Sequence, residues 1–260
     1  MDREFCTVER EEHLTIVTLN RPDTMNALHP PAHFELDLVF NEFAADAQQW
    51  VAIITGAGER AFCAGNDLKF QAAGNRMTFP VSGFGGLTSR FDLNKPVIAA
   101  VNGVAYGGGF EIALSCDIIV AANTAAFALP EPRVGVAALA GGLHRLPRQI
   151  GLKQAMGLIL TGRKISAAEG ARLGFVNEVV PAVDLLRVAR RWSEEITTCS
   201  PMSIRASKEA VMLGLAEPSL QAATEAQIKY PALRQLFKSE DFKEGPLAFS
   251  QRREPVWKNA

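Results

Sequence analysis

Short apolar runs recur along the first two thirds of the chain and predict buried strands. The runs are rich in β-branched residues, end in glycine, proline or asparagine, and are too short for buried helices. The predicted strands cover 14–19, 51–55, 97–101, 117–121 and 175–180. From Val183 onwards the apolar residues follow helical spacing, with breaks expected at Pro201, Gly214, Pro218 and Gly245. The pattern therefore predicts an α/β region followed by an all-helical tail.

Helices are predicted between several of these strands. Pro30 and Pro31 suit the first turn of a helix, and four large apolar residues then recur on one face. These residues are Leu36, Val39, Phe40 and Phe43. Segments 141–150 and 152–160 also follow helical spacing, and Ser166–Glu169 has the capping-box pattern of a short helix that ends at Gly174.

The stretch 96–111 is the most informative for function. A buried strand at 97–101 is expected to lead through a corner rich in glycine, Gly107–Gly109, into a helix that carries Glu111. Glycines let backbone approach another group closely, and the first N–H groups of a helix have no partner inside it. One interpretation is an oxyanion hole beside a carboxylate. The other is a tight packing corner in which Glu111 stabilises the helix N-terminus.

Three further segments could carry function. Residues 56–61 fit the dinucleotide fingerprint G-x-G-x-x-A, but a glycine at position 65 interrupts the helix that this motif needs, which favours a simple turn. The segment 64–69 is predicted to be a second glycine corner with free N–H groups. Segment 74–89 has the composition of a mobile loop over a pocket. Glu131, between two prolines, is expected on a stiff extended loop.

Composition narrows the class of protein. With 260 residues, 48% of them hydrophobic, the chain can bury a large core. A formal net charge of -1 gives no basic field for nucleic acid. The N-terminus lacks the apolar segment of a signal peptide and no run reaches membrane-spanning length, so we expect a cytoplasmic protein. Four widely spaced cysteines indicate neither a disulfide framework nor a zinc site, and we expect them to be buried thiols.

Together these motifs resemble the crotonase superfamily, the family of enoyl-CoA hydratases and isomerases. The matching segments follow the family's order and spacing over nearly the whole chain, and they are 62–68, 95–103, 107–111 and 130–131. The resemblance implies an α/β fold, a spiral of ββα units with two roughly perpendicular sheets. It also implies a catalytic domain at 1–195 and a helical trimerisation region at 196–260. Within the family, segments 51–58, 127–131, 244–249 and 255–258 look most like the branch that hydrates crotonobetainyl-CoA.

The resemblance also implies a site. The oxyanion donors would be the N–H groups of Asn66 and Gly108, and Glu111 and Glu131 match the two hydratase glutamates. The residues leave their division of roles open; our working hypothesis gives Glu131 the protonated role and Glu111 the water-orienting role. The substrate-binding positions implied are Ala27, Ala64, Asp67, Leu68, Lys69, Phe249 and Arg252. Coenzyme A enters as part of the acyl-CoA substrate, and neither a cofactor nor a metal is expected.

The tail carries more apolar residues than a free appendage should expose. They are Leu213, Leu215, Leu220, Leu233, Leu236, Phe237, Leu247 and Phe249. They either fold back on their own domain or cover a partner. The resemblance favours a homotrimer or a dimer of trimers, with Phe249 and Arg252 reaching the coenzyme A on a neighbouring subunit.

Two departures from the family pattern leave the acyl specificity open. Segment 135–142 replaces a proline-glycine segment, and Asn66 replaces the alanine common in short-chain hydratases and the tryptophan associated with the crotonobetainyl branch. Isomerisation or thioester hydrolysis on the same fold remains an alternative. A nucleotide-dependent oxidoreductase lacks its helix, and a non-catalytic protein that binds RNA fits poorly with the charge and the two glutamates.

Overall fold

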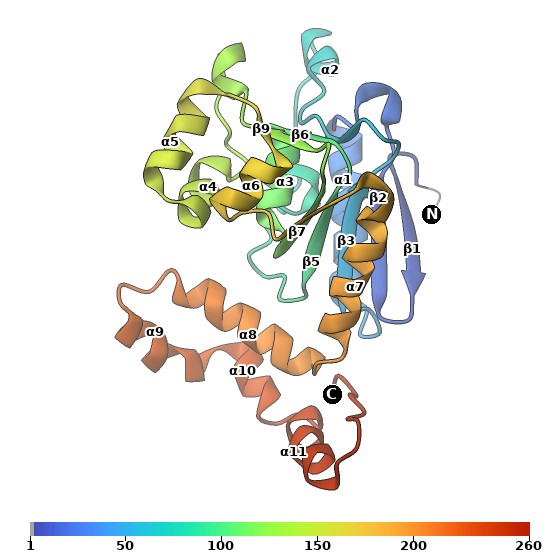
Figure 1. Cartoon of the computed structure of the whole chain (residues 1–260), viewed down its shortest axis with the longest axis vertical. Helices are drawn as coiled ribbons and strands as arrows, with labels where there is room; N and C mark the ends of the chain where they lie inside the picture. The colour runs from blue at the N-terminus through green and yellow to red at the C-terminus, as the bar shows by residue number, and fades with distance from the viewer. Residues whose placement is uncertain (1–2) are drawn as a thin grey trace. The chain divides into compact units, whose positions relative to one another are not determined.

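The strands form two sheets in the computed structural model, which describes residues 3–260 (Figure 1). The six-stranded sheet has the order β1 (Cys6–Glu11), β2 (Leu14–Leu19), β3 (Val51–Gly56), β5 (Val97–Val101), β7 (Ile118–Ala122) and β10 (Glu178–Val180). The four-stranded sheet has the order β4 (Ala61–Cys63), β6 (Val104–Tyr106), β8 (Ala126–Ala128) and β9 (Ile165–Ser166). Only the pairs β1–β2 and β8–β9 are antiparallel in this described part of the chain.

The chain alternates between the sheets in strand–strand–helix units. β3 and β4 precede α2 (Leu68–Ala72), and β5 and β6 precede α3 (Gly108–Ser115). β7 and β8 are followed by the 3-10 helix η3 (Glu131–Val134) and then by α4 (Gly142–Ile150). In each unit the first strand joins the larger sheet and the second joins the smaller one. This arrangement confirms the predicted α/β class.

The remaining elements are helices. The α-helices are α1 (Pro30–Ala45), α5 (Leu152–Thr161), α6 (Ala167–Leu173), α7 (Leu185–Thr197), α8 (Pro201–Gly214), α9 (Leu220–Ala226), α10 (Pro231–Leu236) and α11 (Asp241–Gln251). The 3-10 helices are η1 (Pro22–Thr24), η2 (Phe84–Gly86), η4 (Ala182–Asp184) and η5 (Gln227–Lys229). No helix within residues 3–260 combines the length and the apolar character needed to cross a bilayer.

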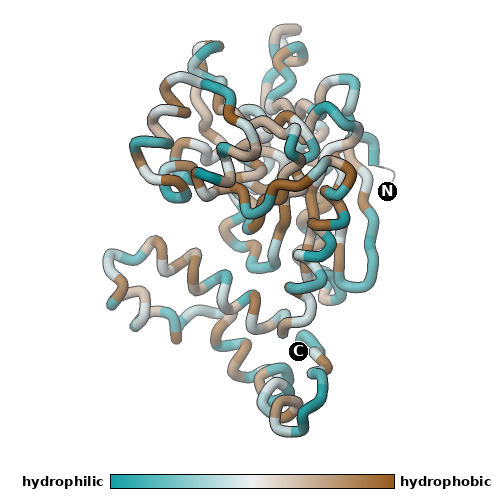
Figure 2. Tube along the Cα trace, in the orientation of Figure 1, coloured by the Kyte–Doolittle hydropathy of each residue, from teal (hydrophilic) through white to brown (hydrophobic). Residues whose placement is uncertain are grey.

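Burial explains which strands the sequence revealed. β3 and β5 are buried at every position, as parallel strands covered on both faces usually are, and they form apolar stretches of the trace (Figure 2). β1 is mostly exposed and polar, and β6 and β9 have only two or three residues, so none of the three was predicted. The last predicted strand is real but shorter, because only Glu178–Val180 pairs with β7.

Several local expectations were wrong. Helix α11 continues through Gly245 and Pro246, where a break was expected. Glu131 begins the 3-10 helix η3 instead of lying on an extended loop. Segment 74–89 is irregular over its first half, as expected, but its second half contains η2 and buries Phe84. Cys199 is exposed, whereas Cys6, Cys63 and Cys116 are buried as expected.

The chain divides into two compact units. Among the described residues, the first comprises 3–90 and 97–191 and contains both sheets, and the second comprises 91–96 and 192–260. Glu209 of α8 shows why 91–96 belongs to the second unit. Its buried carboxylate accepts a hydrogen bond from the Asn94 side chain at 3.2 Å and another from the Ala232 N–H at 2.7 Å.

A cluster of aromatic rings lies under α3. The ring centroids of Phe110, Phe127 and Phe175 are 5.1 to 5.2 Å apart. All three side chains are buried, so they bring α3, β8 and the segment before β10 together. Because Phe110 precedes Glu111 on α3, this packing also fixes the direction of the Glu111 side chain.

Candidate active site

The corner between β6 and α3 is built from glycines in close contact with other backbone. Gly107 has a φ of +53°, and its N–H donates to the Ala128 oxygen at 2.9 Å. A Cβ on Gly109 would lie 2.0 Å from the Cys63 oxygen, and a Cβ on Gly108 would lie 2.4 Å from the Phe84 ring. At Gly109 the obstacle is backbone, so no side chain fits there, and at Gly108 a side chain would have to displace the Phe84 ring. The predicted close approach of backbone at this corner is therefore present.

The second glycine corner touches the first. Gly65 has a φ of +94°, and a Cβ on it would lie 2.8 Å from the Tyr106 oxygen and 3.2 Å from the Gly108 nitrogen. Leu28 holds this corner from the other side, through hydrogen bonds to the Gly65 oxygen at 2.8 Å and from the Asp67 N–H at 2.9 Å. The N–H groups of Asn66 and Gly108 meet no acceptor within residues 3–260, so both remain available to a ligand oxygen.

Glu111 is buried and held by the start of α4. Its Oε1 accepts the Gly142 N–H at 2.8 Å, across 31 residues of sequence. Burial raises the pKa of the Glu111 carboxyl to about 7, and the charge of Glu131 adds to this. The N–H groups of Gly142 and Ala140 and the Arg145 guanidinium act in the opposite direction. A carboxyl group with this pKa can accept and return a proton near neutrality.

Glu131 approaches the same corner from η3. Its Oε1 lies against Gly107, where a Cβ would be only 2.9 Å away. Its Oε2 is buried and has no hydrogen-bond partner among residues 3–260. Burial raises the pKa of the carboxyl, and its own backbone N–H opposes the shift. A buried carboxyl oxygen normally requires a partner, which a water or a substrate can supply here.

A cavity of about 1020 Å³ joins these groups. Asn66, Gly108, Glu111 and Glu131 all line it. Most of the other lining residues are apolar and come from α2, the segment 77–89 and the segment 134–140, namely Leu68, Met77, Phe79, Val81, Phe84, Val134, Val136 and Leu139. Within the described chain, Glu111 and Glu131 are the only charged residues of this lining.

The other predicted binding residues of this unit have mixed surroundings. Leu68 lines the cavity. Asp67 caps α2 by accepting the Phe70 N–H at 3.1 Å and pairs with Arg21 at 3.0 Å, so its observed contacts are structural. Lys69 is exposed on α2.

Two alanines lie beside the corners. Ala64 donates its N–H to the Met25 oxygen at 3.0 Å and so anchors the second corner. Ala27 is buried, and its carbonyl accepts a hydrogen bond from the Arg21 guanidinium. Neither residue is part of the cavity lining described above.

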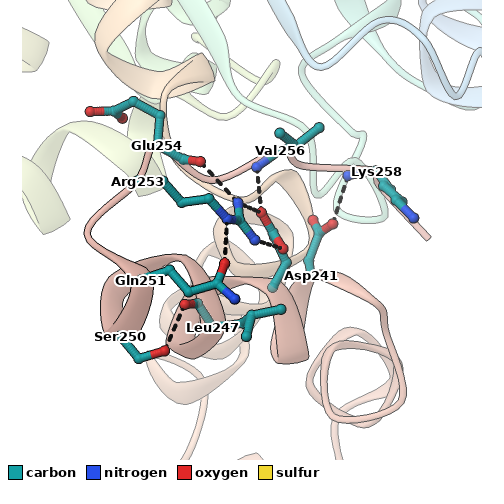
Figure 3. Close-up of polar contacts among 9 residues, drawn as sticks. Asp241, Leu247, Ser250, Gln251, Arg253, Glu254, Val256 and Lys258 are labelled. Atoms are coloured by element: carbon teal, nitrogen blue, oxygen red, sulfur yellow. Dashed lines mark hydrogen bonds and ion pairs between the residues drawn. The ribbon is translucent and has the colours of Figure 1, made fainter.

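Phe249 and Arg252 belong to the second unit, at the end of α11. Phe249 is 85% exposed, and Arg252 has a left-handed φ of +54° at the helix C-terminus. The chain that follows is held by two acids of α11 (Figure 3). Glu244 pairs with Arg253 at 2.5 Å and accepts the Val256 N–H at 2.8 Å, while Asp241 accepts the Lys258 N–H at 2.8 Å.

Sequence reasoning missed the support of the two glutamates. Gly142 lies where the segment that departs from the family pattern meets the predicted helix 141–150, and neither feature indicates a contact with Glu111. Arg145 is one turn further along α4, and its guanidinium donates to the Thr88 oxygen at 2.9 Å. Neither position carries a local motif, because the contacts form only after distant segments pack together. Residues 56–61 have no helix behind them, so the dinucleotide hypothesis is wrong.

Comparisons with known proteins agree with this geometry. The family model for enoyl-CoA hydratase/isomerase matches residues 9–260. A carnitinyl-CoA dehydratase of Escherichia coli (strain K12) is 44% identical over 98% of both chains. One of Proteus mirabilis (strain HI4320) is 42% identical over 93% of this chain and 94% of that protein.

Solved structures extend the likeness to the fold. The crystal structure of enoyl-CoA hydratase from Mycobacterium tuberculosis H37Rv has a TM-score of 0.92 at 38% identity, over 98% of this chain and 99% of the other. That of enoyl-CoA hydratase from Bacillus anthracis has a TM-score of 0.90 at 35% identity, over 99% and 100%. The chain belongs to the enoyl-CoA hydratase/isomerase family, and the resemblance drawn from its motifs is confirmed.

Proposed function

We propose that this enzyme adds water to the double bond of a 2-enoyl thioester of coenzyme A, or removes it in the reverse direction. The observation that carries the proposal is the convergence on one cavity of the buried Glu111 carboxyl, the half-buried Glu131 carboxyl and two backbone N–H groups that have no acceptor among residues 3–260. The relatives named as dehydratases and hydratases support the same reaction class.

The two N–H groups would stabilise charge on the thioester oxygen. Addition of water to a conjugated thioester builds negative charge on that oxygen in the transition state. Donors on Asn66 and Gly108 are fixed by backbone packing, so they need little reorganisation as the charge develops. Removal of one such donor typically costs about 3 kcal/mol of barrier.

The two glutamates would move the protons. One carboxylate accepts a proton from water as the oxygen attacks, and the other carboxylic acid supplies a proton to the α-carbon. In our assignment Glu111 is the base and Glu131 is the acid. The pKa of about 7 at Glu111 suits a base that works near neutral pH, and the two groups titrate as a pair. The proposal includes no metal and no cofactor besides the coenzyme A of the substrate.

For the acyl group we propose crotonobetainyl-CoA as the first substrate to test. Relatives at 42 to 44% identity are named carnitinyl-CoA dehydratase. The trimethylammonium group of this substrate needs aromatic faces or an anion. The cavity offers the rings of Phe79 and Phe84, which are 6.2 Å apart.

Oligomerisation would complete the coenzyme A site. In this proposal the second unit forms a trimer, or a dimer of trimers, and presents Phe249 and Arg252 to coenzyme A bound by a neighbouring copy. An aromatic face can stack on adenine, and a guanidinium matches phosphate. The exposure of Phe249 and of Leu215 and Leu220 supports a surface that is covered by another chain.

The direct test is a spectrophotometric screen of purified protein with crotonobetainyl-CoA, crotonyl-CoA and 2-octenoyl-CoA. Loss of the absorbance of the conjugated thioester reports hydration. We expect hydration of at least one substrate, with the highest kcat/KM for crotonobetainyl-CoA. A preference for the octenoyl thioester would overturn the acyl assignment. If none is hydrated, but a 3-enoyl-CoA gains conjugated absorbance, the enzyme is an isomerase instead.

A further inference from the structure

Arg145 connects α4, whose Gly142 N–H bonds to Glu111, to Thr88 in the cavity lining. Its side chain leaves α4 one turn after Gly142, and its Nη2 donates to the Thr88 oxygen at 2.9 Å. Thr88 is buried and lines the cavity. The Thr88 hydroxyl in turn accepts the Phe84 N–H at 2.9 Å, and the Phe84 ring lies against Gly108. A continuous set of contacts therefore runs from α4 to the proposed oxyanion corner.

The same guanidinium also packs on the N-terminus of α4. Gly141, with a φ of +105°, precedes the helix, and a Cβ there would lie 2.1 Å from the Arg145 Nη1. The Arg145 N–H bonds to the Gly141 oxygen at 2.8 Å. Gly142 is the next residue, and its N–H is the donor to Glu111. The position of the Gly142 N–H therefore depends on the contact between the Arg145 guanidinium and the turn at Gly141.

We propose that Arg145 is a positioning residue for the hydration reaction. It holds the start of α4 against Thr88 in the cavity lining and so maintains the hydrogen bond from the Gly142 N–H to Glu111. The inference rests on the proposed function, because it concerns the same two carboxyl groups. Arg145 does not line the cavity in the described structure, so its effect on substrate is indirect.

The charge of Arg145 adds a second, separable effect. Four groups act on Glu111, namely the Glu131 carboxyl on η3, the Arg145 guanidinium on α4, and the N–H groups of Ala140 and Gly142 before and at the start of α4. The Glu131 charge raises the pKa of Glu111, and the other three lower it. Loss of the positive charge therefore makes Glu111 harder to ionise, and the acidic limb of the pH profile moves to higher pH.

The test compares Arg145→Gln and Arg145→Lys with the control Arg148→Gln. Arg148 is exposed on the same helix, and within residues 3–260 its guanidinium donates only to the nearby His144 oxygen, at 2.8 Å. The control removes an equal charge without touching Thr88 or Gly141. For each protein kcat and KM are measured across pH with an enoyl-CoA that the wild type hydrates, and folding is followed by circular dichroism.

For Arg145→Gln we expect kcat to fall by about tenfold to a hundredfold, as for a displaced catalytic group, with KM nearly unchanged. The acidic limb should move up by about half a pH unit or more. Arg145→Lys should keep the limb in place and recover part of kcat, and Arg148→Gln should match the wild type.

Several results would overturn the positioning role. One is a wild-type kcat and pH profile in Arg145→Gln. An acidic limb that moves equally in the Lys and Gln variants overturns the separate charge effect, because loss of the Gly142 N–H alone would also move the limb. If Arg145→Gln does not fold, kcat and the acidic limb are measured in Arg145→Lys instead, and wild-type values there would overturn the proposal. If Arg145→Lys does not fold either, Arg145 has a purely structural role and the proposal is wrong. A wild type that hydrates no enoyl-CoA refutes the proposed function instead, so the two failures are distinct.

Discussion

Replacing Gly108 with alanine tests the proposed oxyanion corner most sharply. The new Cβ would lie 2.4 Å from Phe84 Cζ, whereas carbon atoms normally approach to about 3.5 to 4.0 Å. Either the ring or the start of α3 must therefore move by about 1 Å. The ring is buried, and the Phe84 and Gly85 N–H groups are bonded to Thr88 and His33, so the loop resists the movement.

The structure gives the expected size of the effect. Overpacking of this kind costs about 1 to 3 kcal/mol of unfolding free energy. A displacement of about 1 Å in a group that acts on the transition state can lower the rate by about a hundredfold. We therefore expect Gly108→Ala to remain folded at low temperature and to lose about a hundredfold or more in kcat, with a smaller change in KM.

The assay combines the hydration rate with urea unfolding, and Gly157→Ala is the matched control. Gly157 lies inside α5, and a Cβ there meets nothing within 4 Å. The control should keep full activity and gain up to about 1 kcal/mol of stability, because alanine favours a helix over glycine. Phe84→Leu in the Gly108→Ala background should restore part of kcat. Full activity in Gly108→Ala would show that the proposed donor lies elsewhere.

Three further predictions concern the acids and the tail. Glu111→Gln and Glu131→Gln should each lower kcat by about a hundredfold or more with little change in coenzyme A affinity, and near-normal hydration by either folded variant would refute their joint role. Because burial raises the pKa of Glu111 from 4.5 to about 7, the folded chain binds more protons between these values than the unfolded chain. The contribution of Glu111 to the unfolding free energy should therefore be highest below about pH 4.5 and fall by on the order of 3 kcal/mol towards pH 7 and above; in urea titrations, the difference in unfolding free energy between the wild type and Glu111→Gln should show this fall. Phe249→Ala with Arg252→Ala should raise KM for coenzyme A thioesters and leave kcat largely intact, and sedimentation should give three or six chains; a monomer with unchanged KM would contradict this.

The sequence predicted those parts of the fold whose signals are local. β3 and β5 were predictable because both their faces are buried, which leaves only apolar residues in the runs. The helix α6 was predictable from its cap, since the Ser166 hydroxyl accepts the Glu169 N–H at 3.1 Å. β1 was missed because its exposed residues are charged or polar, and its strand state depends on pairing with β2.

Errors occurred where distant contacts outweigh local preference. Gly245 and Pro246 should weaken a helix, yet α11 runs through both. The neighbouring Glu244 is held by Arg253 and by the Val256 N–H, so contacts with the following chain support the helix at this point. In the same way Glu131 starts a 3-10 helix. Pro132 fits the first turn of this helix, because an N–H group at that position would have no partner inside the helix.

The same distinction between local signals and distant contacts applies to the candidate site. Asn66, Gly108, Glu111 and Glu131 could be selected from motifs, because each lies in a segment with its own glycine or proline signature. Their environment could not be predicted, because the contacts of Gly142, Arg145 and Phe84 join residues that lie 24 to 57 positions apart in the sequence.

The two halves of the proposed chemistry consequently differ in how the fold supports them. The donor pair depends on backbone packed against backbone, since Gly65 contacts Gly108 with no space for a side chain. The environment of Glu111 instead depends on the N–H groups of Ala140 and Gly142 and on the charge of the half-buried Arg145 guanidinium, which come from α4 and the segment before it. Substitutions at the glycine corners should therefore change kcat at every pH alike, whereas substitutions at the start of α4 should also move the pH at which the enzyme works best. This difference separates the two supports in one set of pH–rate profiles.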